Sequence, residues 1–138
     1  THGLDAKKRL TIPSEWRALV GSPDRLFVLP SAVERCLAVY PARVIAQRLQ
    51  KLNDFSEVDE EAQNHMRELA ANANLVPWDA QGRIRIKDNL LEYAQLTTEV
   101  VMVGVFTRFE LWSPALWKQK QPVIDQQKLG KAARSVGL

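Results

Sequence analysis

The sequence predicts an α+β protein made of two fused, pseudo-symmetric repeats with an inserted helical hairpin. One short pattern occurs twice, as DAKKRLTI at residues 5–12 and DAQGRIRI at 79–86, with an offset of 74 positions. The same offset pairs Ser14 with Asp88, and both residue types are good helix N-caps. Each copy therefore predicts a polar turn, a short strand and a capped helix.

A strand hairpin is predicted after the short helix in each half. In the first half, apolar runs at 25–29 and 36–40 flank a polar connection. In the second half, runs at 99–104 and 109–112 flank a shorter one. Paired apolar runs around a turn are typical of β-hairpins. Each half is thus expected to contain a strand, a short helix, a hairpin and a following helix.

Two further helices are predicted between the halves. The first covers residues 41–53, and the second follows Ser56 as its cap, with acidic residues in a first turn that suits the positive end of the helix dipole. We expect both apolar stripes to pack on the β core, with an oligomer contact as the alternative. These stripes contain Val44, Ile45, Leu49 and Leu52 in the first helix, and Ala62, Met66, Leu69, Ala70 and Ala73 in the second.

These elements divide the 138 residues into four expected segments. The first repeat with its trailing helix covers 1–52, a connecting helix covers 53–74, the second repeat covers 75–118, and a basic tail covers 119–138. With 46% hydrophobic residues, the chain can bury a core as one unit of two fused halves. The tail is expected to be a frayed, solvated end, or alternatively a sequence-independent contact to phosphates.

Composition and motifs argue against several classes of protein. No run approaches 18 apolar residues and no hydrophobic signal core is present, so a cytoplasmic protein without a membrane partner is expected. Cys36 is the only cysteine, and a buried, inert thiol is expected. His2 and His65 lack companions at metal-ligand spacing, so no metal site is expected. Because phosphate-loop and nucleophile motifs are also absent, we expect no catalytic residues, cofactor or small-molecule substrate.

The positive charge is small overall but concentrated in the repeated motif. A net charge of +3 and a sequence pI near 9.2 do not by themselves indicate a nucleic-acid binder. Strand alternation, however, places the motif cations outward and their apolar neighbours inward. Arginine can donate two hydrogen bonds to guanine and lysine neutralises phosphates, so two matched basic edges predict contacts to double-stranded DNA. The candidate cations are Lys7, Lys8 and Arg9 in the first copy, and Arg83, Arg85 and Lys87 in the second.

An aspartate precedes the first arginine of each motif by four residues. Asp5 and Asp79 can accept hydrogen bonds from the amides of the turn, or hold the arginine fork before DNA binds. The competing interpretation is an ion pair that only closes the turn. The residues alone favour neither interpretation.

Several segments also match the pattern of a known family, namely LDAKKRLTIPSEWR, CLAVYP, DAQGRIRI and EVVMVGVFTRFELWSPALW. With them the chain resembles the bacterial MraZ proteins, whose two AbrB-like halves each carry a D-x-x-x-R signature. The resemblance implies a swapped-hairpin, AbrB-like β barrel assembled into a homo-oligomeric ring. It also implies a nucleoid-associated transcriptional repressor of its own division and cell-wall gene cluster, which binds short guanine-rich direct repeats in promoter DNA. The family signature falls on Asp5, Arg9, Asp79 and Arg83.

Two positions depart from the family pattern. Lys8 stands where these proteins usually have glycine, which Gly82 retains in the second half. If this position needs a positive φ, Lys8 costs on the order of 1 kcal/mol while adding a cation beside the DNA. Lys87 replaces the proline found at Pro13 in the first half. We therefore expect the first half to have the greater role in DNA binding.

Two other functions fit parts of the sequence. An AbrB-like antitoxin would carry one motif per chain and a disordered tail that wraps a toxin, whereas this chain has two fused copies and a short tail. A ring-forming scaffold would use the helical hairpin and apolar edges to bind other proteins without reading DNA. Under the scaffold hypothesis, replacing Arg9 and Arg83 would change nothing measurable.

Overall fold

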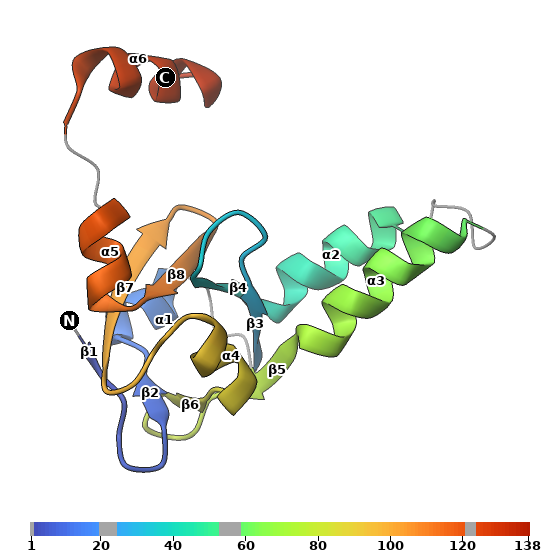
Figure 1. Cartoon of the computed structure of the whole chain (residues 1–138), viewed down its shortest axis with the longest axis vertical. Helices are drawn as coiled ribbons and strands as arrows, with labels where there is room; N and C mark the ends of the chain where they lie inside the picture. Colours follow the sequence, from blue (N-terminus) through green and yellow to red (C-terminus); the bar gives the residue numbers. More distant parts are fainter. Residues whose placement is uncertain (1, 20–24, 53–58, 121–123) are drawn as a thin grey trace.

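The chain has an α+β, AbrB-like fold in which a curled antiparallel sheet carries short helices and a projecting helical hairpin (Figure 1). The computed structural model describes residues 2–19, 25–52, 59–120 and 124–138. The strands are β1 (His2–Gly3), β2 (Arg9–Thr11), β3 (Arg25–Pro30), β4 (Leu37–Pro41), β5 (Asn74–Pro77), β6 (Arg83–Arg85), β7 (Glu99–Val105) and β8 (Arg108–Trp112). The helices are α1 (Ser14–Leu19), α2 (Ala42–Leu52), α3 (Glu60–Asn72), α4 (Asp88–Tyr93), α5 (Pro114–Lys120) and α6 (Gln126–Ser135).

The element order predicted for each half is confirmed. The first half runs β2, α1, β3, β4, α2, and the second runs β6, α4, β7, β8, α5. Strand β5 was missed, and it begins at Asn74, the last residue that the prediction gave to the connecting helix. Its four residues start with Asn and end with Pro, two types that are depleted in strands.

The two halves exchange strands. The larger sheet has the order β1-β7-β8-β4-β3-β5, so β1 of the first half pairs with β7, and β5 of the second half pairs with β3. Strands β2 and β6 pair with each other in a second, two-stranded sheet, with Leu10 opposite Ile84. This exchange is the swapped-hairpin arrangement that the resemblance implied.

The core lies where the alternating strands turn their apolar sides inward. Leu10, Ile12, Ile84 and Ile86 are at most 1% exposed, whereas the residues that alternate with them are half-buried (Arg9 and Arg83) or exposed (Thr11 and Arg85). The predicted alternation is therefore confirmed in both halves. Cys36 is also buried as predicted, and burial raises the pKa of its thiol to about 12.

The predicted helix caps differ from the structure. Ser14 is the first residue of α1 and therefore lies one position inside the helix. The N-cap of α4 is Lys87, and Asp88 is the first helical residue. The side chain of Asp88 forms ion pairs with Lys8 and Arg85 instead of accepting hydrogen bonds from helix amides. The N-cap of α3 is Asp59, whose carboxylate accepts a hydrogen bond from the Ala62 amide at 3.1 Å. The predicted cap of that helix, Ser56, lies outside the described residues.

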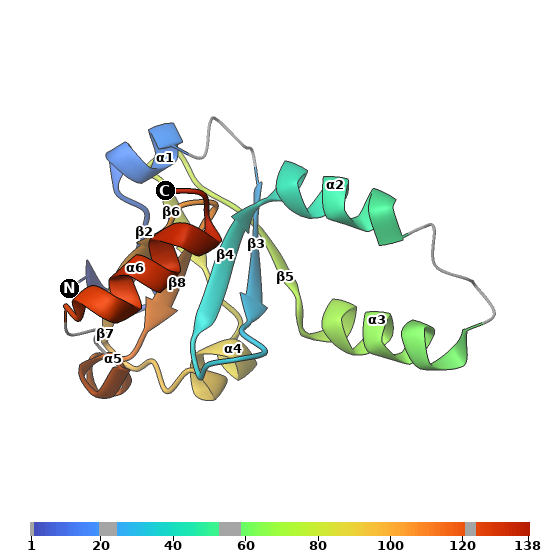
Figure 2. The same cartoon turned by 90° about the horizontal axis from the view of Figure 1, so that it is seen from above.

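Helices α2 and α3 run side by side and project away from the sheet (Figure 2). No residue of α3 is buried, and Leu69 on its apolar stripe is 47% exposed. On α2, Val44 and Ile45 are half-buried, while the side chains of Leu49 and Leu52 lie outside the described part. The prediction that both stripes pack on the β core is therefore wrong for α3, because α3 projects away from the sheet and comes near it at the end that leads into β5, beside β3.

The C-terminal tail contains a helix, so the expectation of a frayed end is wrong. Asp125 caps α6 by accepting hydrogen bonds from the amides of Gln127 and Lys128 at 2.9 and 3.3 Å. Leu129 and Val136, on one side of this helix, are 60% and 69% exposed. Within the described ranges, no helix is long and apolar enough to cross a membrane.

Candidate nucleic-acid interface

The first D-x-x-x-R motif forms a tight turn that is organised by the carboxylate of Asp5. Its Oδ1 accepts hydrogen bonds from the amides of Lys7 and Arg9 at 2.9 and 2.8 Å. Its Oδ2 accepts one from Nε of Arg9 at 2.7 Å. The Lys8 amide also donates to the Asp5 carbonyl at 2.9 Å, which closes the turn. One carboxylate thus fixes both the backbone of the turn and the arginine side chain.

The second motif repeats this geometry with different residues between its aspartate and arginine. Oδ1 of Asp79 accepts from the amides of Gln81 and Arg83, each at 2.9 Å, and Oδ2 accepts from Nε of Arg83 at 2.7 Å. The Gly82 amide donates to the Asp79 carbonyl at 2.9 Å. The two turns are therefore structurally equivalent.

Both aspartates stay ionised in this arrangement. The backbone amide of Arg9 makes the largest contribution in lowering the pKa of Asp5, and that of Arg83 does the same for Asp79. Desolvation opposes the shift, while the arginine side chains add to it. Each carboxylate thus both closes its turn and orients its arginine, a geometry that fits either of the two interpretations left open by the sequence.

The two terminal nitrogens of each arginine are not used by its aspartate. Arg9 and Arg83 are bound through Nε, and their side chains are 29% and 28% exposed. Among the described residues, neither guanidinium donates a further hydrogen bond through its two terminal nitrogens. Two terminal nitrogens in one plane suit a pair of acceptors such as N7 and O6 of guanine.

The fourth position of each turn has the left-handed conformation that the family glycine suggested. Lys8 has a φ of 58° and Gly82 a φ of 75°. A Cβ atom at Gly82 would lie 2.7 Å from Cζ of Arg17, which packs over this glycine. A side chain at position 82 would therefore be conformationally strained and would require the flexible end of Arg17 to move, whereas Lys8 adopts the strained conformation with an exposed side chain.

The fold brings the two turns to one edge of the molecule (Figure 1). Strands β2 and β6 are antiparallel, with Arg9 opposite Arg85 and Thr11 opposite Arg83. The Ile12 amide also donates to the carbonyl of Gly82 at 2.8 Å, which joins the two motifs directly. We call this surface the basic edge, and define it by the predicted cations Lys7, Lys8, Arg9, Arg83, Arg85 and Lys87.

Two further cations of the basic edge share one more carboxylate, that of Asp88. Nζ of Lys8 lies 3.2 Å from Oδ1 of Asp88, and Nη2 of Arg85 lies 3.0 Å from the same oxygen. Arg85 also donates through Nη1 to the carbonyl of Ile86. Lys87 is exposed, and its backbone amide donates to Oδ1 of Asn74 at 3.0 Å.

Sequence reasoning missed two residues of this region. Asp88 was interpreted only as a helix cap, although its position next to three motif cations was a signal of ion pairing. Arg17 carried no signal, because its contact with Gly82 depends on the exchange of strands between the halves. Nε of Arg17 is buried without a hydrogen-bond partner in the described residues.

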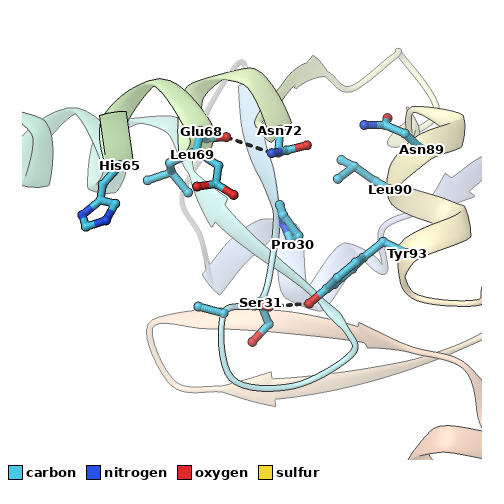
Figure 3. Close-up of a pocket in the computed structure, with 10 residues that line it drawn as sticks. Pro30, Ser31, His65, Glu68, Leu69, Asn72, Asn89, Leu90 and Tyr93 are labelled. Carbon is cyan, nitrogen blue, oxygen red and sulfur yellow. Dashed lines mark hydrogen bonds between the residues drawn. The ribbon is translucent and has the colours of Figure 1, made fainter. Parts of the chain in front are cut away.

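A separate pocket of about 480 Å³ lies between α3, α4 and the connection after β3 (Figure 3). The Tyr93 hydroxyl donates to the Ser31 carbonyl at 2.8 Å, and His65 and Glu68 lie on the α3 side. The Glu68 carbonyl accepts a hydrogen bond from the Asn72 side chain at 2.9 Å. No cluster of potential metal ligands is found in the described residues. None of the residues that line this pocket belongs to the basic edge.

The fold and the site together define an AbrB-like protein with two D-x-x-x-R turns on one basic edge. A family model described as "MraZ protein, putative antitoxin-like" matches residues 69–135. The chain is similar to proteins named transcriptional regulator MraZ. That of Clostridium tetani is 32% identical over 141 residues, covering 99% of this chain and 95% of the relative. That of Moorella thermoacetica is 39% identical over 118 residues, covering 86% and 80%. The chain belongs to the MraZ family.

Proposed function

We propose that the chain is a sequence-specific, DNA-binding transcriptional regulator that represses its own division and cell-wall gene cluster. It acts in the cytoplasm at the nucleoid and binds short guanine-rich direct repeats in promoter DNA. The relatives named as transcriptional regulators support this class of function. The observation that carries the proposal is the matched pair of arginines, Arg9 and Arg83, each held through Nε and open at its terminal nitrogens.

In this mechanism the cations of the basic edge have two kinds of role. Arg9 and Arg83 donate paired hydrogen bonds to guanine, and the aspartates before them limit the loss of side-chain freedom on binding. Lys7 and Lys87 are exposed and neutralise phosphates, which adds affinity without sequence preference. Sequence preference therefore depends on the arginines.

The test is a binding titration with the DNA upstream of the gene and a scrambled duplex, at two salt concentrations. We expect the parent protein to prefer the upstream DNA, and the double variant Arg9→Ala, Arg83→Ala to lose that preference. The matched control is Arg35→Ala with Arg67→Ala, which removes two exposed arginines away from the basic edge. Equal, weak binding of both duplexes by parent and double variant would contradict readout and favour the scaffold.

We also propose that the protein assembles into a homo-oligomeric ring. An apolar groove of about 630 Å³ separates the helical hairpin from the sheet, lined in part by Phe27, Ile45, Met66 and Ala73. A contact between this groove and a different surface of the next subunit closes into a ring when the rotation permits. Neighbouring subunits would then bind repeats about one helical turn apart, and such linkage raises apparent affinity by about 100-fold or more.

The ring is tested by light scattering at several protein concentrations. Met66→Asp places a charge in the groove, and we expect it to reduce the mass toward that of a monomer. Asn64→Asp adds the same charge at an exposed position of α3 and should leave the mass unchanged. A monomeric parent would contradict the ring without bearing on DNA readout by one chain.

A further inference from the structure

We propose that Asp88 is a specificity-determining residue, which suppresses sequence-independent DNA binding by occupying Lys8 and Arg85. The proposal rests on the DNA-binding function proposed above and assigns a role to an acidic residue within the basic edge. Asp88 touches neither Arg9 nor Arg83 through any ion pair or hydrogen bond in the described residues. It therefore acts on phosphate binding and leaves the base-reading arginines as they are.

The geometry places one carboxylate oxygen between cations of the two halves. Oδ1 of Asp88 lies 3.2 Å from Nζ of Lys8 and 3.0 Å from Nη2 of Arg85. Lys8 comes from the first turn, whereas Arg85 and Asp88 flank the end of β6. Such a junction exists only because β2 and β6 pair across the halves.

These ion pairs are too exposed to contribute much to the stability of the fold. The side chains of Lys8 and Arg85 are 53% and 46% exposed, and that of Asp88 is 59% exposed. Solvent-exposed pairs of this kind contribute little to the free energy of folding. They nevertheless change the charge that a DNA phosphate meets, because the phosphate must displace the carboxylate or lie beside it.

The effect differs between specific and non-specific complexes. In a non-specific complex, phosphate contacts supply most of the affinity, so repulsion by Asp88 weakens binding directly. In the specific complex, hydrogen bonds from Arg9 and Arg83 to bases add to the phosphate term. Asp88 therefore lowers the background of binding to arbitrary DNA and increases the ratio between specific and non-specific affinity.

The first half provides the matched substitution. Ser14 stands at the position equivalent to Asp88, and Thr11 at the position equivalent to Arg85, so the first half has neither the acid nor the extra cation. Asp88→Ser thus introduces the residue that the chain itself uses at the start of α1. Asp88→Asn removes the charge with nearly unchanged shape, and Asp88→Glu restores it.

The experiment measures affinity for the upstream DNA and for a scrambled duplex over a range of salt concentrations. For Asp88→Ser and Asp88→Asn, we expect affinity for the scrambled duplex to rise by about three- to tenfold at low salt. The slope of log affinity against log salt should steepen by about 1 to 2, as Lys8 and Arg85 become available to phosphates. The ratio of specific to scrambled affinity should fall, and Asp88→Glu should resemble the parent.

The control is Glu92→Gln, which makes the same change in net charge at an exposed position of the same helix. If Asp88→Asn and Glu92→Gln change the affinity ratio and the salt slope equally, the role of Asp88 is overturned. If the parent prefers its upstream DNA and only the Asp88 variants lose part of that preference, the proposal is supported. A parent that binds neither duplex would overturn both this inference and the proposed function.

A second comparison tests whether Asp88 changes DNA binding through Lys8 and Arg85. In a background of Lys8→Gln with Arg85→Gln, the carboxylate has lost both partners, so adding Asp88→Asn should change the salt slope by much less than in the parent. An undiminished change would mean that Asp88 acts by general repulsion and not through these two cations. That result would overturn the mechanism proposed here.

Discussion

The two turns of the basic edge have the same hydrogen bonds but different surroundings. Each aspartate binds two amides and one arginine Nε, with the sequence AKK between the ends of the first motif and AQG in the second. The surroundings differ because Lys8 reaches Asp88, whereas Gly82 lies under Arg17. The comparison teaches that the Asp and the Arg define the turn, while the positions between and after them adjust its charge.

The largest expected effect comes from removing each arginine separately. Arg9→Ala and Arg83→Ala should each reduce specific affinity by about 1 to 3 kcal/mol if each fork reads a guanine. We expect the loss to be larger for Arg9→Ala, since Lys8 adds a cation only beside the first turn. Titrations of both single variants against upstream DNA measure this difference. A uniform loss on specific and scrambled duplexes would count against base readout.

Gly82→Ala should lower the stability of the protein and so distinguish the second turn from the first. A Cβ at a φ of 75° is strained, and it would lie 2.7 Å from Cζ of Arg17. We expect a loss of about 1 to 2 kcal/mol in the free energy of unfolding, measured by chemical denaturation. The control is Gly3→Ala, where the nearest atom to an added Cβ is 3.9 Å away. Equal stability of the two variants would show that neither the positive φ nor the contact with Arg17 lowers the stability of the Gly82→Ala variant.

Lys8→Gly should make the first turn more like the second. Relief of the positive φ favours the folded state, while the greater freedom of glycine favours the unfolded state. We expect a net stabilisation below about 1 kcal/mol, together with weaker binding to scrambled DNA because a cation is lost. Thermal melting and a titration measure the two quantities. Destabilisation would mean that the freedom of glycine in the unfolded chain, together with the lost Lys8–Asp88 ion pair, outweighs the strain.

The smallest expected effect concerns the two aspartates. Their folded pKa values lie below the ordinary value of 3.8, so their contribution to stability is complete above that pH and is lost as the pH falls through the lower values. Arg9→Ala removes the side-chain partner of Asp5 but keeps the backbone amide, which is the largest cause of the shift. Carboxyl titration by NMR should show Asp5 moving part of the way toward 3.8, with Asp79 unchanged. A full return to 3.8 would contradict the dominant role of the amide.

Much of this architecture was predictable from the repeated pattern. The recurrence of D-x-x-x-R, the alternation around Leu10 and Ile84, and the apolar runs of both hairpins are local signals, and the structure confirms the elements they predicted. The exchange of strands followed from the family resemblance. No local pattern contains it, because pairing of β1 with β7 joins residues almost a hundred positions apart.

Other features depended on contacts that sequence patterns do not contain. Asp88 is a residue type that often caps helices, yet its carboxylate pairs with Lys8 of the first turn and Arg85 of β6. The apolar stripe of α3 looked like a core-facing stripe, but amphipathic periodicity does not identify the partner surface. The tail has a helix because Asp125 caps it, a signal that its basic composition obscured.

The exchange of strands also has a consequence for how the protein is synthesised. As the chain leaves the ribosome, β1 emerges well before its partner β7, which is about a hundred residues later in the chain. Strand β3 likewise has no neighbour on its β5 side until residues 74–77 have been made. Until β5 and β7 have been made, the nascent first half has unpaired strand edges, which promote aggregation. The first half therefore completes its sheet only after these strands of the second half have been synthesised.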